Sequence, residues 1–167
     1  DNWYKNNISG TKNEKYLADN IFCNDRSFSP NNTGTGSGQS ETIYRGYAPG
    51  SNLTFNCSQK NDAFTVRDTK NGNGELTYPI GLITIDEAAL AGGYCSNSKY
   101  YLYSGSEYWT LSPKDFDNSL TAMQFVKENG DLFCSTLFSV NGSVRPVINI
   151  SQEVLNKGDG SMNDPYR

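Results

Sequence analysis

The chain has 167 residues and a net charge of −4, from 18 acidic and 14 basic side chains, and it contains no histidine. An acidic chain argues against binding to nucleic acid or to an anionic lipid surface, because both need an excess of Lys and Arg. The lack of histidine removes the commonest general base, the commonest metal ligand and the usual partner of a Ser or Cys nucleophile. The composition therefore argues against an enzyme and implies no cofactor, and the length predicts a single domain over residues 1–167.

The polarity of the chain is carried by uncharged groups. Charged residues are only 19% of the sequence, whereas aromatic residues are 13% and include 11 tyrosines. About 25% charged residues is usual for soluble domains. A composition rich in Asn, Ser, Thr, Gly and Tyr is typical of the surfaces of secreted β-rich proteins. It is also typical of surfaces that bind a partner through hydrogen bonds.

The four cysteines predict disulfides in an oxidising compartment. None of Cys23, Cys57, Cys95 and Cys134 lies in a C-x-x-C pair, which disfavours zinc or thioredoxin-like chemistry. Three pairings are possible, and we prefer Cys23–Cys57 with Cys95–Cys134 because each bridge then stays within one half of the chain. Four buried free thiols remain the alternative. No run of 18 apolar residues and no signal-peptide core is present, so we expect an export signal or anchor upstream of Asp1.

The first half of the chain predicts few regular elements. Taken in order, we expect a short helix at 13–19 with Asn13 as its N-cap, a short buried segment at 21–23, an exposed loop at 29–38, a strand at 64–66, a turn at 71–74 and a strand at 80–83.

The clearest local signal is a capping box. Thr84 is followed three residues later by Glu87, just before an apolar run that ends at Gly92-Gly93. In this pattern the threonine caps the helix and the glutamate reaches back to the free N–H. The pattern predicts a helix from Ile85 to Leu90 or Ala91.

The second half predicts a sheet. Short apolar and aromatic runs alternate with turn residues, and we expect strands at 100–103, 108–112, 122–126, 132–137 and 143–150. Pro113 is expected to end the second strand, a polar loop follows at 115–120, and 128–131 is expected to form a hairpin turn. Helical residues precede strands, so the predicted class is α+β.

Several motifs resemble one group of families. Residues 81–91 (GLITIDEAALA) resemble the L-P-T-E-x-E-W motif that leads from a strand into a helix in formylglycine-generating-enzyme-like and C-type-lectin-like domains. Residues 108–113 (YWTLSP) resemble the Y-W-S-S strand of the same domains. Ala122-x-x-Phe125, Gly130 and 143–147 (SVRPV) resemble the closing A-x-x-F, G and G-V-R-P-V strands. The segments 22–27 (FCNDRS) and 158–166 (GDGSMNDPY) are similar to those of bacterial domains found in prepilin-like proteins.

The resemblance implies a C-type-lectin-like α+β fold, with a mainly antiparallel twisted sheet, one or two short helices and long loops. It implies a fold and a location rather than a chemistry. Cys95 and Cys134 do not stand in the context of formylglycine-generating catalysis, and the Glu-Pro-Asn, Gln-Pro-Asp and Trp-Asn-Asp tripeptides of calcium-dependent sugar binding do not occur.

The candidate binding site is a cluster of tyrosines and oxygen-rich loop residues. Tyr and Trp supply rigid amphipathic contact area for a sugar or a protein. Strand alternation would place Tyr101 and Tyr103 on one face. Trp109 is expected in the core. The predicted ligand-binding residues are Tyr101, Tyr103, Tyr108, Asp115, Asp117 and Asn118.

Other polar clusters favour structural roles. Three groups could offer oxygens to Ca²⁺, but none has full EF-hand spacing, so we interpret them as turn chemistry and predict no metal site. They are Asp115 with Asp117, Asp68 with Asn71, Asn73 and Glu75, and Asp159 with Asn163 and Asp164. The adjacent Asp86 and Glu87 raise the question of a glycosidase, but the capping box explains Glu87 better. Arg145 is expected to bind a buried carboxylate or backbone carbonyls.

The leading hypothesis is a non-enzymatic binding domain on a bacterial cell surface or pilus, which recognises a protein or glycan through the tyrosine-rich loops. One alternative is a pilin or pseudopilin subunit whose surface contacts other pilus subunits. A second alternative is a receptor domain of C-type-lectin type with diversified loops. We expect no nucleic-acid partner and contact with a membrane only through an N-terminal anchor.

Overall fold

The structure is a computed structural model, and it describes residues 1–28, 40–41, 53–93, 97–116, 121–136, 141–156, 158–159, 161 and 163–164. Two α-helices, three short 3₁₀ helices and six strands occur in this part of the chain, which makes it a mixed α+β fold. In chain order they are α1 (Asn2–Asn7), η1 (Glu14–Tyr16), β1 (Phe22–Cys23), β2 (Ser40–Glu41), η2 (Lys60–Asp62), β3 (Ala63–Phe64), α2 (Ile85–Leu90), β4 (Tyr108–Phe116), β5 (Thr121–Val126), β6 (Leu132–Thr136) and η3 (Gln152–Val154).

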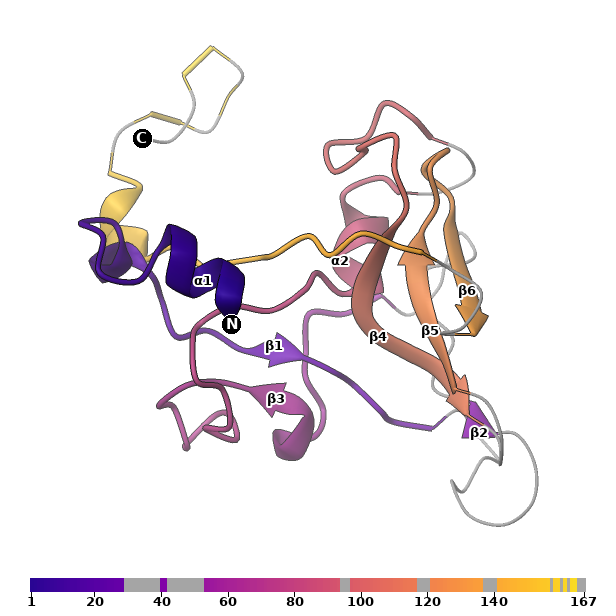
Figure 1. Cartoon of the computed structure of the whole chain (residues 1–167), viewed down its shortest axis with the longest axis horizontal. Helices are drawn as coiled ribbons and strands as arrows, with labels where there is room; N and C mark the ends of the chain where they lie inside the picture. The colour runs from indigo at the N-terminus through magenta and orange to yellow at the C-terminus, as the bar shows by residue number, and fades with distance from the viewer. Residues whose placement is uncertain are drawn as a thin grey trace.

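The elements form two groups, as Figure 1 shows. The larger group is an antiparallel sheet in the order β2-β4-β5-β6, with α2 against β4, β5 and β6. The smaller group holds α1 and the antiparallel pair β1-β3. Residues 141–150 run between the two groups, and single bridges tie them to Tyr108, to Gly81 and to Leu17.

The core lies between α2 and the sheet. Ile85 and Ala88 of α2 are fully buried against Tyr108, Val126 and Leu132. Burying a large apolar side chain contributes roughly 1.5–3 kcal/mol, so this cluster stabilises the larger group. The helix itself starts as the sequence predicts: the Thr84 hydroxyl accepts from the N–H of Glu87 at 3.1 Å, and the Glu87 carboxylate accepts from the N–H of Thr84 at 2.7 Å.

A disulfide and an ion pair hold the smaller group together. The Cys23–Cys57 bridge is present, which confirms the first half of the preferred pairing. Cys95 lies outside the described residues, as does the side chain of Cys134, so the second bridge stays a prediction. Near the first bridge, Arg26 pairs with the buried carboxylate of Asp62 and also donates its backbone N–H to it at 2.9 Å.

Five of the expected elements differ in the structure. Residues 100–103 form a turn and not a strand, and 80–83 and 143–150 make only isolated bridges. At 13–19 a single 3₁₀ turn replaces the helix; Asn13 stands at its N-cap position, but its side chain makes no capping hydrogen bond. The strand expected to end before Pro113 continues to Phe116, because the register shifts on both sides of Pro113 and accommodates its missing N–H.

Other predictions agree with the structure. Residues 128–131 form the turn of the β5-β6 hairpin, where Gly130 has a φ of 88°, a conformation that favours glycine. The segment expected at 21–23 and the strand expected at 64–66 are confirmed in part, because β1 and β3 pair at 22–23 and 63–64, while Ile21 is exposed and 65–66 lie outside the strand. The exposed loop expected at 29–38 and most of the polar loop at 115–120 fall outside the described residues.

Candidate functional site

The tyrosine loop, residues 97–106, joins α2 to β4 (Figure 1). It begins against the end of the helix, where the side-chain amide of Asn97 donates to the carbonyl of Gly92 at 2.8 Å. A tight turn follows, in which the N–H of Tyr103 donates to the carbonyl of Tyr100 at 3.1 Å. The loop is therefore tied to α2 and folded back on itself.

Two buried tyrosines support the loop from the core. Tyr100 and Tyr108 are 7% and 1% exposed, and their hydroxyl oxygens lie 3.0 Å apart. The Tyr108 hydroxyl donates to the carbonyl of Leu102 at 3.3 Å. Because a hydroxyl carries one proton, Tyr100 is then the donor to Tyr108. Burial raises the pKa of Tyr100, and its bond to Tyr108 raises it further, so this hydroxyl stays protonated at neutral pH.

Arg145 supplies a further support, from the segment that runs between the two groups. Its Nη1 donates to the carbonyl of Leu102 at 2.7 Å, and its guanidinium lies 4.6 Å from the centroid of the Tyr108 ring. The sequence predicts a carboxylate or backbone carbonyls as the partner of Arg145, and the structure confirms the carbonyl. The carbonyl of Leu102 thus accepts from two donors, which fixes the middle of the tyrosine loop.

Two tyrosines of the loop face solvent. Tyr101 is 90% exposed, and Tyr103 is 37% exposed with its ring edge-on to Tyr100 at a centroid distance of 6.3 Å. They are exposed because they stand on a turn, and not through the strand alternation that the sequence suggests. Leu102, between them, packs against the core beside α2. The loop therefore presents two aromatic side chains to solvent from a backbone that hydrogen bonds hold in place.

The remaining predicted ligand residues do not join this surface. Tyr108 lies in the core, where its ring packs under Arg145 and its hydroxyl holds the loop; no external ligand can reach it. Trp109, which was expected in the core and not among the ligand residues, is half-buried and packs against Phe125 at a centroid distance of 5.6 Å. The backbone of Asp115 pairs with that of Glu41 between β4 and β2. The side chain of Asp115 and all of Asp117 and Asn118 lie outside the described residues.

The described oxygen-rich clusters act as turns. Asp68 accepts from the N–H groups of Lys70 and Asn71, each at 2.9 Å, and from the Asn71 amide at 2.7 Å. Its hydrogen bonds with Asn71 lower the pKa of Asp68. Asp159 likewise accepts from the N–H of Ser161 at 2.8 Å. Within the described ranges, no three Cys, Asp or Glu side chains gather as metal ligands would.

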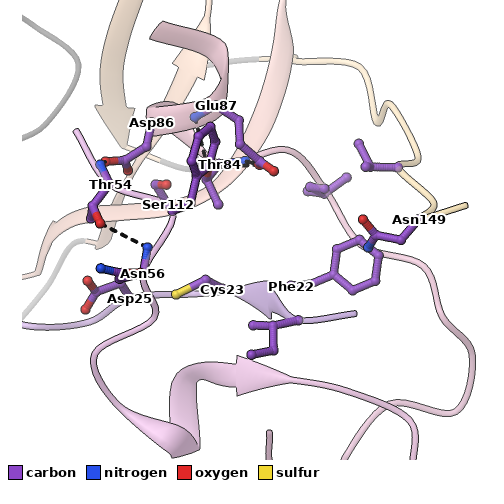
Figure 2. A pocket seen from close by; sticks show the side chains of 14 residues that line it. Phe22, Cys23, Asp25, Thr54, Asn56, Thr84, Asp86, Glu87, Ser112 and Asn149 are labelled. Carbon is purple, nitrogen blue, oxygen red and sulfur yellow. Dashed lines mark hydrogen bonds between the residues drawn. The ribbon is translucent and has the colours of Figure 1, made fainter. Parts of the chain in front are cut away.

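A second feature, not anticipated from the sequence, is a pocket of about 180 Å³ between β1 and the start of α2, which Figure 2 shows. Asp86 and Glu87 line it from α2, and Asp25 lines it from the segment after β1. No pattern along the chain signals that these carboxylates line one pocket, because Asp25 is distant in the sequence from Asp86 and Glu87.

The three carboxylates of this pocket serve as backbone acceptors. Asp86 accepts from the N–H of Thr54 at 3.0 Å, and Asp25 accepts from the N–H of Ser27 at 2.9 Å. Glu87 completes the capping box of α2. The Asp86–Thr54 bond holds the segment at 53–56 beside the helix, whereas the Asp25–Ser27 bond lies within the segment after β1.

Two results bear on the wider identity of the chain. None of the helices in the described part of the chain is long and apolar enough to cross a membrane. Comparison with protein-family models, with curated proteins and with solved structures finds no match to this chain.

Proposed function

We propose that this chain is a non-enzymatic binding domain of a cell surface or pilus, with the tyrosine loop as its recognition surface. The observation that carries the proposal is the exposure of Tyr101, 90%, on a loop whose backbone is held by Tyr108 and Arg145. Exposed aromatic side chains on a fixed backbone are favourable for binding, because little conformational freedom is lost when a partner docks.

The proposal extends to fold and location. The motifs at 81–91, 108–113 and 143–147 support a C-type-lectin-like version of the α+β fold. The Cys23–Cys57 bridge supports an oxidising, extracellular environment, where such bonds persist. A Cys95–Cys134 bridge would complete the same pattern. The partner is a protein or glycan on a cell surface.

The experiment is a binding screen of the whole chain. Fluorescently labelled protein is applied to a glycan array and to intact bacterial and epithelial cells. We expect saturable binding that Tyr101→Ala reduces at least about tenfold, as removal of an aromatic anchor commonly does. Tyr16→Ala is the matched control, because Tyr16 is also exposed but lies on η1. Equal binding by all three proteins contradicts the assignment of the tyrosine loop.

A second candidate function, a pilus subunit, is favoured by an apolar groove of about 260 Å³. Exposed Trp3 and Val144 line this groove together with Leu82 and Pro146. Apolar side chains gathered on a surface are typical of contacts between subunits. Sedimentation of the whole chain distinguishes the two functions: self-association lost in Val144→Asp favours subunit packing, and a monomer at high concentration favours the binding domain.

A further inference from the structure

A third cavity, of about 470 Å³, lies in the smaller group of elements, beside α1 and η1. The cavity is separate from the tyrosine loop, which belongs to the larger group of elements (Figure 1). Ligand pockets of proteins commonly have volumes of roughly 300–1,000 Å³, so this cavity has room for a small molecule. What it could bind follows from three properties of its lining: an aromatic ring, two cations and two carboxylates.

The aromatic wall is the ring of Tyr78. It stacks on the buried ring of Tyr4, with centroids 4.7 Å apart and an angle of 22° between the planes. The Tyr4 hydroxyl donates to the Glu14 carboxylate at 3.2 Å, which fixes this lower ring in turn. Burial raises the pKa of Tyr4, and the bond to Glu14 adds to the effect, so the hydroxyl remains a donor. Tyr78 is thus a positioned, half-buried ring that lines the cavity.

The two cations at the cavity are Lys15 and Arg67. Both side chains are exposed, and within the described part of the chain neither forms an ion pair. A third cation, Lys5, lies 5.8 Å from the centroid of the Tyr78 ring. Glu14 and Asp19 balance the charges of Lys15 and Arg67 in the lining, so the cavity offers separate cationic and anionic positions rather than an excess of positive charge. The cations can bind an anionic group, although Lys15 also lies over the ring of Tyr16, with its Nζ 4.8 Å from the centroid.

The two carboxylates already have protein partners but keep acceptor capacity. Asp19 accepts the N–H groups of Val66, Arg67 and Asp68 at 2.7, 2.6 and 3.0 Å, which positions Arg67 at the cavity. Glu14 accepts from the N–H of Gly10 at 2.7 Å as well as from Tyr4. An ionised carboxylate has about four lone-pair sites, so each can still accept from a hydroxyl group.

We propose that this cavity binds an acidic sugar, a saccharide unit that carries a carboxylate. Its apolar C–H face would lie on the ring of Tyr78, its carboxylate on the guanidinium fork of Arg67 with Lys15 as a second cation, and its hydroxyls on Glu14 and Asp19. A phosphate-rich ligand fits less well, because it carries several negative charges, whereas an acidic sugar carries one carboxylate for the cations and hydroxyl groups that Glu14 and Asp19 can bind. A neutral sugar would make no ion pair with Arg67 or Lys15. This site uses none of the residues of the tyrosine loop, so either proposal can fail alone.

The test is a titration of the whole chain, followed by ¹H–¹⁵N NMR, with D-glucuronate, D-glucose and acetate as probes. We expect glucuronate to bind in the millimolar range and to shift the amide signals of Val66, Arg67 and Tyr78. Glucose and acetate should bind at least about tenfold more weakly, because glucose lacks the carboxylate and acetate lacks the sugar ring. Equal binding of glucose and glucuronate, or no binding of glucuronate, overturns the proposal.

Variants assign the binding to the cavity. Arg67→Ala should weaken glucuronate binding about tenfold or more, because a charge-assisted hydrogen bond is lost. It should keep the fold, since Asp19 accepts from the backbone N–H of Arg67 and not from its side chain. Lys60→Ala is the control and should bind as the wild type does, because Lys60 is an exposed cation on η2 that does not line this cavity. Glucuronate binding that survives Arg67→Ala unchanged contradicts the site.

Discussion

Arg145 and Leu102 stand 43 positions apart in the sequence and are joined by a hydrogen bond of 2.7 Å from the guanidinium to the carbonyl. The same guanidinium lies over the ring of Tyr108. The bond connects the segment between the two groups of elements to the tyrosine loop. The loop therefore depends on residues that are distant in the chain, and that dependence can be measured.

Removal of this connection should destabilise the protein and loosen the loop. Arg145→Ala removes a charge-assisted hydrogen bond and a cation–π contact, and we expect a loss of about 2–3 kcal/mol in the free energy of unfolding in urea. Amide exchange at 101–104 should accelerate. Arg145→Lys should keep part of the stability, because it keeps the charge but loses the planar fork. A loss below about 0.5 kcal/mol, the range of ordinary surface changes, contradicts the support role.

The hydroxyl of Tyr108 should matter although its ring never meets solvent. Tyr108→Phe removes the donor to Leu102 and leaves the Tyr100 proton without its acceptor. We expect a cost of about 1–2 kcal/mol, because a buried polar group loses its partner. Tyr16→Phe, at an exposed position on η1, is the control and should stay within about 0.5 kcal/mol of the wild type. Equal values for the two variants would falsify the anchoring role.

The sequence predicts elements whose signal is local. The capping box at Thr84 and Glu87 needs only residues three apart, and the structure reproduces both of its hydrogen bonds. The hairpin turn before β6 rests on Asn and Gly at adjacent positions, which accept positive φ. The Cys23–Cys57 bridge is present as predicted from the preference that each bridge stays within one half of the chain.

Elements that depend on distant partners could not be predicted in this way. Tyr100 to Tyr103 have strand-forming side chains, yet Arg145 and Tyr108 bind the carbonyl in their midst and stabilise a turn. The segment 143–150 has the composition of a strand, but in the structure it crosses between the two groups of elements and makes only isolated bridges. α1 is polar and lacks helical periodicity, and Tyr4 is its one buried residue.

The candidate site was partly accessible from the sequence. Tyrosine content points to Tyr101 and Tyr103, whose exposure the structure shows. It cannot separate them from Tyr108, because burial is set by the packing of α2 on the sheet. The cavity around Tyr78 was not anticipated either, since its lining comes from several separate segments of the chain.

The Cys23–Cys57 bridge should be a principal stabiliser of the smaller group. It spans a separation of 34 residues. In the chain-entropy model, closing a loop of this size contributes about 3–4 kcal/mol. The double variant Cys23→Ser with Cys57→Ser should lose about that much in urea unfolding, and a non-reducing peptide map of the wild type should show the linked peptides. Free thiols at both positions in oxidised protein contradict the assignment.

Asp19 should make stability depend on pH in the acid range. Burial alone raises the pKa of Asp19, but its three backbone N–H donors outweigh this and lower the pKa below the ordinary 3.8. A group with a lowered pKa in the folded state stabilises the protein above its unfolded pKa, and that contribution is lost as pH falls through the folded pKa. Asp68 lies close by and acts in the opposite direction, raising the pKa of Asp19.

The stability difference between wild type and Asp19→Ala should therefore be constant from neutral pH down to about pH 5 and should shrink below about pH 4. Thermal unfolding at a series of pH values measures it. At neutral pH we expect Asp19→Ala to cost about 2–3 kcal/mol, since three donors lose a charged acceptor. A difference that stays the same down to pH 2 would show that the charge of Asp19 is not what stabilises the segment at 66–68.

The most direct test of the proposed binding function compares stability and binding in the same preparation of Tyr101→Ala. Because Tyr101 is 90% exposed, its removal should change the melting temperature by no more than an ordinary surface substitution does. Binding to cells or to an arrayed glycan should nevertheless fall at least about tenfold. Tyr103→Ala, which also loses the contact with Tyr100, should reduce both. Wild-type binding by a well-folded Tyr101→Ala protein would contradict the tyrosine loop as the recognition surface.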